Sequence, residues 1–264
     1  MRTNHEIDYK IFGEEMQYVE VELDPNETAI AEPGAFMMMD DGIQMETLFG
    51  DGSQQNSGGF LGKLLNAGKR VLVGENLFMT AFSNASAGKK RVSFASPYPG
   101  KIIPLDLMNY QGKIICQKDA FLCAAKGVSI GIEFQRKLGT GLFGGEGFIM
   151  EKLEGDGMAF VHASGFVMEK ELQHGELLKV DTGCIVAFTS TVDYDIQFVG
   201  GIKNTIFGGE GLFFATLRGP GKVWIQSLPI SRLASRILTY GTYKRKEEGS
   251  ILGGIGNMLD GDGW

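Results

Sequence analysis

Three glutamates recur at the same place in a repeated glycine-rich motif, and they are the polar side chains that the repetition preserves. Residues 142–147 read LFGGEG and residues 206–211 read IFGGEG, so Glu146 and Glu210 are 64 residues apart (210 − 146 = 64). A fainter third copy contains Glu75. If the three carboxylates converged, they would repel one another unless a cation or arginines neutralised them. The interpretation that we favour is local: each glutamate accepts hydrogen bonds from its own glycine turn.

The chain offers few residues for general-base or nucleophilic catalysis. Its three histidines are His5, His162 and His174, and His162 alternates with Met158 and Phe160, which predicts a hydrogen-bonded core imidazole rather than a ligand. The sequence has no His-Glu-x-x-His zinc helix and no phosphate-binding loop of the Walker type. We therefore expect no catalytic residue, no cofactor and a protein that is not an enzyme.

The three cysteines do not have the spacing of a metal site. Cys116, Cys123 and Cys184 each lie inside an apolar run, and no Cys-x-x-Cys pair is present. This pattern predicts reduced thiols in the core and no bound metal.

Composition and charge narrow the class of protein further. The chain has 264 residues, a net charge of -7 and 43% hydrophobic residues. An acidic chain is a poor ligand for phosphates, so nucleic acid is an unlikely partner. Residues 1–9 lack the apolar stretch of a signal peptide, and no apolar run reaches the ~18 residues of a membrane span. We expect a cytoplasmic protein.

Apolar residues alternate with polar ones in many short segments, which is the pattern of half-buried strands. In 18–23, Val19, Val21 and Leu23 alternate with glutamates, and turn-forming residues separate the later segments. The 39 glycines fit a chain with many turns. The sequence predicts a mainly β fold, either a sandwich or a barrel-like unit, with short helices only in an insertion and near the C-terminus.

The motif belongs to a longer internal repeat. We expect a single β-rich domain over residues 1–240, made of three pseudo-repeats of about 18–110, 111–175 and 176–240 around a pseudo-threefold axis. Three independent modules are the alternative, and we disfavour them because no linker separates the copies. Residues 241–264 are glycine-rich, which predicts a mobile tail.

The first copy carries extra residues between about 47 and 73, and their apolar side chains fall roughly on one helical face. We expect a short helix that contacts another subunit or a lipid surface, while the alternative is that it caps an open end of the β core. The apolar contact residues are Phe60, Leu61, Leu64 and Leu65, with Lys63, Lys69 and Arg70 at the polar margin.

These features together carry a resemblance to a known family. The GGEG motifs, the methionine run after 32–35, the glycine-rich insertion and the turn at 96–100 resemble the mitochondrial-biogenesis Aim protein family and its bacterial homologues. That family is similar in fold to the tryptophan RNA-binding attenuation protein. The resemblance implies a β-rich fold with internal pseudo-symmetry, self-association and, in mitochondria, support of inner-membrane organisation. We interpret this chain as a bacterial member.

The function that we expect is a non-enzymatic scaffold that assembles as a homo-oligomer and contacts a membrane surface or a protein partner. One alternative is a small-ligand-binding protein or an enzyme that uses a β cavity or the three repeated glutamates. A less favoured alternative is an RNA-binding ring, since a shared fold does not transfer function and the acidic charge opposes it.

Overall fold

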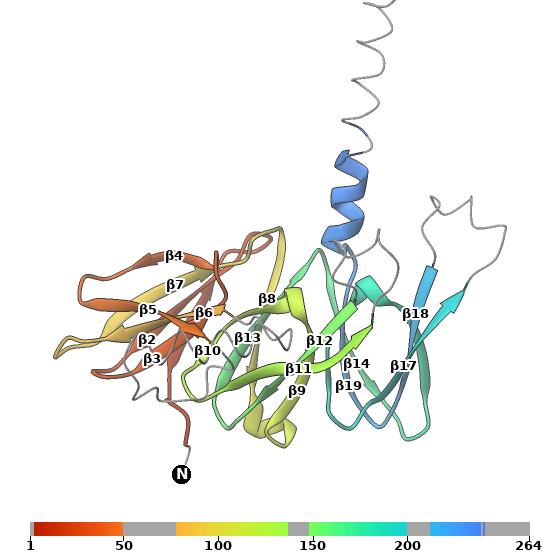
Figure 1. Ribbon diagram of the computed structural model, residues 1–264, viewed down its shortest axis with the longest axis horizontal. Coiled ribbons are helices and arrows are strands. Elements are labelled where there is room, and N and C mark those ends of the chain that lie inside the picture. Colours follow the sequence, from red (N-terminus) through yellow and green to blue (C-terminus); the bar gives the residue numbers. More distant parts are fainter. Residues whose placement is uncertain (1–2, 50–77, 137–147, 200–211, 239, 241–264) are drawn as a thin grey trace, which may run out of the picture.

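The computed structural model describes residues 3–49, 78–136, 148–199, 212–238 and 240. This part of the chain is almost entirely β-structure, with a helix at residues 230–238 (Figure 1). The strands of the first half are β1 (Asp8–Phe12), β2 (Tyr18–Leu23), β3 (Thr28–Ala31), β4 (Phe36–Met39), β5 (Ile43–Phe49), β6 (Phe78–Asn84), β7 (Lys90–Ala95), β8 (Gly100–Asp106) and β9 (Lys113–Gln117). Those of the second half are β10 (Phe121–Ala125), β11 (Ser129–Arg136), β12 (Phe148–Glu154), β13 (Met158–Ser164), β14 (Val167–Leu172), β15 (Leu177–Asp181), β16 (Ile185–Thr189), β17 (Asp193–Val199), β18 (Leu212–Arg218) and β19 (Gly221–Gln226). Three short 3-10 helices connect some of them: η1 (Leu107–Tyr110), η2 (Lys118–Ala120) and η3 (Thr182–Cys184).

The alternation in the sequence has the predicted consequence in β2. Val19, Val21 and Leu23 are fully buried, whereas Glu20 and Glu22 lie on the other face. Glu22 forms ion pairs there with Lys89 (2.9 Å) and with an arginine of β7. Because these pairs are exposed, the buried aliphatic face is what holds the strand in place. The prediction of a mainly β fold is confirmed.

The strands form four antiparallel sheets. In spatial order they are β1-β2-β7-β4, β5-β6-β3-β10-β13-β8, β11-β12-β9-β16-β19-β14 and β15-β18-β17. No closed barrel forms among the described strands.

One pattern of pairing occurs three times along the chain. We define repeat one as β2 to β7, repeat two as β8 to β13 and repeat three as β14 to β19. In each repeat the first strand pairs with the sixth and the sixth with the third, while the second pairs with the fifth and the fifth with the fourth. The first residues of β15 to β18 also follow those of β9 to β12 at the predicted offset of 64, as from Lys113 to Leu177 (177 − 113 = 64).

A local irregularity recurs with the pattern. The register between the third and sixth strands shifts by one residue, in the manner of a β-bulge, at the same place in each repeat. The skipped residues are Met37 in β4, Leu122 in β10 and Val186 in β16. The pairing pattern does not test the predicted threefold axis or the predicted domain boundaries, which stay predictions. In Figure 1 the repeats follow one another in a row, with β4 and β7 at one end and β17 and β18 at the other.

Each repeat is split between two sheets, and the two six-stranded sheets each contain strands of two repeats. The hydrophobic clusters therefore combine residues of different repeats. The largest hydrophobic cluster contains Ile30 of β3, Met79 of β6, Leu153 of β12 and Trp224 of β19, so it draws on all three repeats. A second cluster lies mostly in repeat one and a third mostly in repeat three. The three repeats therefore share one hydrophobic cluster.

Candidate assembly interface

The residues that the sequence singles out for binding lie outside the described part of the chain. This applies to Glu75, Glu146 and Glu210, which precede β6, β12 and β18 along the sequence, and to the predicted contact helix with Phe60, Leu61, Lys63, Leu64, Leu65, Lys69 and Arg70. The extra residues do fall between β5 and β6, where the other repeats have shorter connections. The candidate site therefore has to be built from the strands.

Neighbouring repeats are joined by one kind of strand pair. The third strand of a repeat pairs with the second strand of the preceding repeat, which gives the pairs β10–β3 and β16–β9. In the first pair Cys123 faces Ala31, and in the second Ala187 faces Cys116. These residues occupy matching positions, because Cys123 and Ala187 are 64 apart (187 − 123 = 64). Both junctions use the same register.

Pairing with a neighbour buries the third strand. All five residues of β10 are buried, as are the first four of β16. The strands opposite them are buried to a similar degree, since β3 is wholly buried and β9 is buried except at Lys113. The junctions are thus apolar on both sides, which makes burial the main stabilising contribution.

Strand β4 is the third strand of repeat one, the first of the three described repeats. Among the described strands it pairs only with β7, at the edge of its sheet. Its four residues are Phe36, Met37, Met38 and Met39, and their side chains are between 39% and 48% exposed. The counterparts in β10 and β16 are apolar too, but buried. An apolar edge strand left open in this way is a template for pairing with another chain.

Strand β15 is the matching open edge at the other end. It is the second strand of repeat three and pairs only with β18 among the described strands. Leu177 is 52% exposed, and Lys179 is also exposed. The counterparts of Lys179 are the buried residues Ile30 and Ile115. A lysine on an edge strand disfavours pairing with other chains, so β15 is a less favourable edge for pairing than β4.

The remaining edges give a reference. The fourth strands β5, β11 and β17 end their sheets in all three repeats, and the first strands β8 and β14 end theirs. An open edge at these places is therefore a regular feature of the repeat. Strands β4 and β15 differ, because their counterparts pair with a neighbouring repeat.

A cavity opens beside the first junction. It has a volume of about 160 Å³ and contains two acidic side chains, Glu32 after β3 and Glu151 of β12, together with Lys118. Glu151 is only 3% exposed, and neither carboxyl has a hydrogen bond or ion pair within the described residues. The other lining residues are Pro33, Phe78, Met79, Phe121 and Ile130.

Burial controls the titration of both carboxyls. It raises the pKa of Glu151 to about 8, and the charge of Glu32 adds to this effect while Lys118 opposes it. Burial also raises the pKa of Glu32 to about 7, with a further contribution from Asp119. The second junction lacks the acid pair, because Gln117 and Ala215 stand at the corresponding positions. Sequence reasoning missed these residues, since Glu32 and Glu151 are far apart in the chain.

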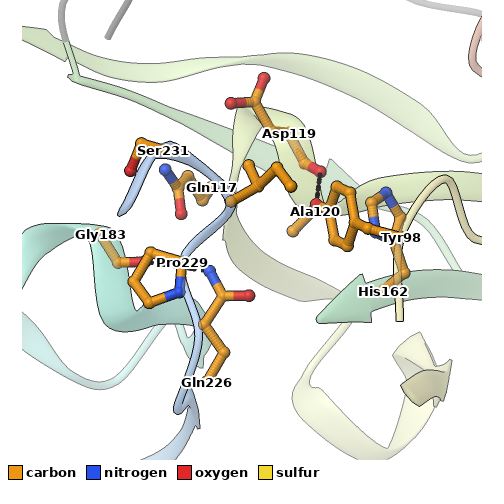
Figure 2. A pocket seen from close by; sticks show the side chains of 10 residues that line it. Tyr98, Gln117, Asp119, Ala120, His162, Gly183, Gln226, Pro229 and Ser231 are labelled. Carbon is orange, nitrogen blue, oxygen red and sulfur yellow. Dashed lines mark hydrogen bonds between the residues drawn. The ribbon is translucent and has the colours of Figure 1, made fainter. Parts of the chain in front are cut away.

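A smaller pocket lies where repeat two meets the end of repeat three (Figure 2). In it, Gln226 donates to the carbonyl of Gly183 (3.0 Å) and accepts from the backbone N–H of Ser164 (2.8 Å). His162 stands 64 residues before Gln226 (226 − 162 = 64) and is buried against the ring of Tyr98. Its Nδ1 has no hydrogen-bond partner among the described residues. The predicted core position of His162 is correct, but the predicted hydrogen bond is not formed at this atom.

Replacing His162 with glutamine is expected to reduce the loss of stability in acid. Burial lowers the pKa of His162 to about 4. Between about pH 6.5 and pH 4, the histidine is therefore protonated in the unfolded chain but not in the folded chain. Stability should therefore fall as the pH drops through this window, by about 3 kcal/mol. In urea titrations at pH 7 and pH 4.5, His162→Gln should lose less stability than the wild type. Equal losses would contradict the assignment.

The cysteines match their prediction in part. All three are free, and Cys116 and Cys123 are buried, but Cys184 is half-buried at the end of η3, just before β16. Burial raises the pKa of the Cys116 and Cys123 thiols. These two thiols are therefore core residues.

Among the described helices, none is long and apolar enough to cross a membrane.

Comparison with known proteins agrees with the strand arrangement. An uncharacterised protein of Streptococcus pyogenes serotype M6 is 30% identical over 226 residues, which cover 84% of this chain and 86% of that protein. A crystal structure of a Streptococcus pyogenes protein has a similar fold, with a TM-score of 0.69, 24% identity, and coverage of 89% of this chain and 99% of that one. The family model described as mitochondrial biogenesis AIM24 matches residues 9–228. The chain therefore belongs to the mitochondrial biogenesis AIM24 family, as the motifs in its sequence predicted.

Proposed function

We propose that this protein is a non-enzymatic scaffold that assembles with itself through the open edge of β4. The observation that carries the proposal is the contrast between β4 and its counterparts: the same apolar third strand is buried in repeats two and three and exposed in repeat one. A second chain on this edge would cover the four side chains and satisfy the outward backbone groups.

The size of the edge sets the strength that we expect. Removing the exposed part of four large apolar side chains from water contributes on the order of 3 to 4 kcal/mol, and backbone hydrogen bonds add to it. Association of two proteins costs at least about 4 kcal/mol in lost motional freedom. Self-assembly through β4 is therefore reversible and depends on the protein concentration.

A charge placed on β4 should prevent assembly. Met38→Asp is expected to raise the dissociation constant by at least ~10-fold, because an aspartate in an apolar strand junction would be buried without a partner. The matched control is Met45→Asp on β5, where the methionine is 50% exposed on an edge that is open in every repeat. Sedimentation velocity over a concentration series measures both variants, and circular dichroism checks their fold. Equal dissociation constants for Met38→Asp, Met45→Asp and the wild type would refute the proposal.

A second contact, to a membrane surface or a protein partner, is proposed through the extra residues of repeat one. The support is their sequence pattern, with Phe60, Leu61, Leu64 and Leu65 on one face and Lys63, Lys69 and Arg70 at its margin. Deleting 57–66 is expected to leave the β-sheet spectrum unchanged and to reduce pelleting with anionic lipid vesicles. Vesicle binding that survives the deletion would exclude this contact.

The cavity at the first junction favours a second candidate function, binding of a small organic cation. A cavity of about 160 Å³ is large enough for one aromatic ring, and Glu32 and Glu151 supply two carboxyls without partners among the described residues. Benzamidine tests this, with neutral benzamide as the control of equal shape. Binding of benzamidine should strengthen as the pH rises, because the two carboxyls ionise. Lys118 favours this ionisation and Asp119 opposes it. Binding should be lost in Glu151→Gln. No difference between the two probes at pH 8.5 would exclude the site.

A further inference from the structure

We propose that β4 of one chain pairs antiparallel with β15 of a second copy, head to tail, in the register of the internal junctions. This inference rests on the proposed self-assembly and adds the partner strand and the residues that meet. It would join two incomplete sheets into one, in the order β17-β18-β15-β4-β7-β2-β1. Apart from β1, that order repeats the arrangement of the two six-stranded sheets inside the chain.

The register follows from the two junctions that the structure contains. Cys123 pairs with Ala31 at the first, and Ala187 pairs with Cys116 at the second. The β4 counterpart of Cys123 is Met38, because repeat one precedes repeat two by 85 residues here (123 − 38 = 85, and 116 − 31 = 85).

The β15 counterpart of Cys116 is Val180, because repeat three follows repeat two by 64 residues (180 − 116 = 64). Met38 should therefore face Val180 of the second copy. Since the strands are antiparallel, Met39 should face Lys179 of the second copy.

The position of the two edges requires a second chain. Strand β4 lies at one end of the row of repeats, and β17 and β18, which form one sheet with β15, lie at the other (Figure 1). A contact between two different surfaces of identical chains leaves one of each kind open after every addition. Such contacts produce a ring when the rotation between chains closes and a filament when it does not.

Lys179 makes this joint weaker than the internal ones. At the corresponding place, Ile30 packs in the first junction and Ile115 in the second. A lysine can lay its aliphatic stem along Met39 of the neighbouring chain, but its ammonium must stay in water. The chain thus has two permanent junctions of the same design and one reversible junction between copies.

Substitution of Lys179 by isoleucine gives the first test. The expected effect is a gain of association, which a damaged fold would not produce. Lys179→Ile restores the residue type of both internal junctions, so it should strengthen self-association by at least ~10-fold in sedimentation velocity. The control is Lys222→Ile on β19, which is paired on both sides. An unchanged dissociation constant for Lys179→Ile would count against β15 as the partner strand.

Disulfide trapping gives the second test. Met39→Cys combined with Lys179→Cys should yield a ladder of cross-linked chains on a non-reducing gel, because facing residues of an antiparallel pair lie within disulfide distance. Met45→Cys combined with Lys179→Cys is the control outside the interface, and the native cysteines are present in both proteins. If the wild type forms oligomers but the double-cysteine variant does not cross-link between positions 39 and 179, this pairing is wrong and the scaffold proposal stands. A wild type that stays monomeric would overturn both.

Discussion

Replacing Glu151 with glutamine is expected to stabilise the protein by about 3 to 4 kcal/mol at pH 8.5 and to change its stability little at pH 5. The reason is the cavity at the first junction, where the carboxyl is 3% exposed and has no hydrogen-bond partner among the described residues. Ionising such a group is costly, whereas a neutral amide of the same shape avoids the cost.

The direction of the pH effect follows from the raised pKa. The pKa of Glu151 is about 8 in the folded protein, against an ordinary value of 4.5. Between these values the folded chain holds a proton that the unfolded chain has lost, so stability falls as the pH rises from about 4.5 to about 8. Urea titrations across this range should show the fall in the wild type and a much smaller one in Glu151→Gln. The control Glu154→Gln removes a surface carboxylate that pairs with Lys152, and it should keep the slope of the wild type.

Replacing Trp224 with alanine is expected to destabilise the whole described fold by about 3 to 5 kcal/mol. The indole is 2% exposed, contacts Tyr110 edge to face and donates its N–H to Glu169 (2.9 Å). It belongs to the cluster that also contains Ile30 and Met79 of repeat one. Because this cluster draws on all three repeats, the loss should lower the stability of all three together.

The matched variant is Trp224→Phe, since Phe160 occupies the corresponding position of repeat two and is also fully buried. It should cost less than about 1.5 kcal/mol, because most of the volume is kept. Hydrogen exchange should show that Trp224→Ala speeds opening in β3 and β6 as well as in β16 and β19. Faster exchange confined to repeat three would mean that the repeats fold as independent modules.

Much of the fold could be predicted because it depends on local patterns. The alternation at Val19, Val21 and Leu23 fixes one buried face, and a repeat offset of 64 fixes where four strands of repeat three begin from those of repeat two. The helix at 230–238 could be predicted as well, because Leu233 and Ile237 have helical spacing. The order of the strands within each sheet depends on contacts between distant segments and could not be read from the sequence.

The candidate interface could not be predicted for a physical reason. The sequence of β4 is FMMM and that of β10 begins FLCA, so both look like buried strands. Their exposure differs because β10 pairs with β3 of the preceding repeat, whereas β4 has no such partner among the described strands. This is a property of the sheet and not of the strand. Glu151 was missed in the same way, since its cavity also needs Glu32 from the other side of the junction.

The most direct test of the central claim is hydrogen–deuterium exchange of the wild-type protein at low and at high micromolar concentration. We expect amide protection in the peptides that contain β4 and β15 to rise with concentration, because pairing between chains gives their outward N–H groups acceptors. Peptides that contain β5 and β17, whose edges stay open, should exchange at the same rate throughout. Exchange in β4 and β15 that does not depend on concentration would contradict the account.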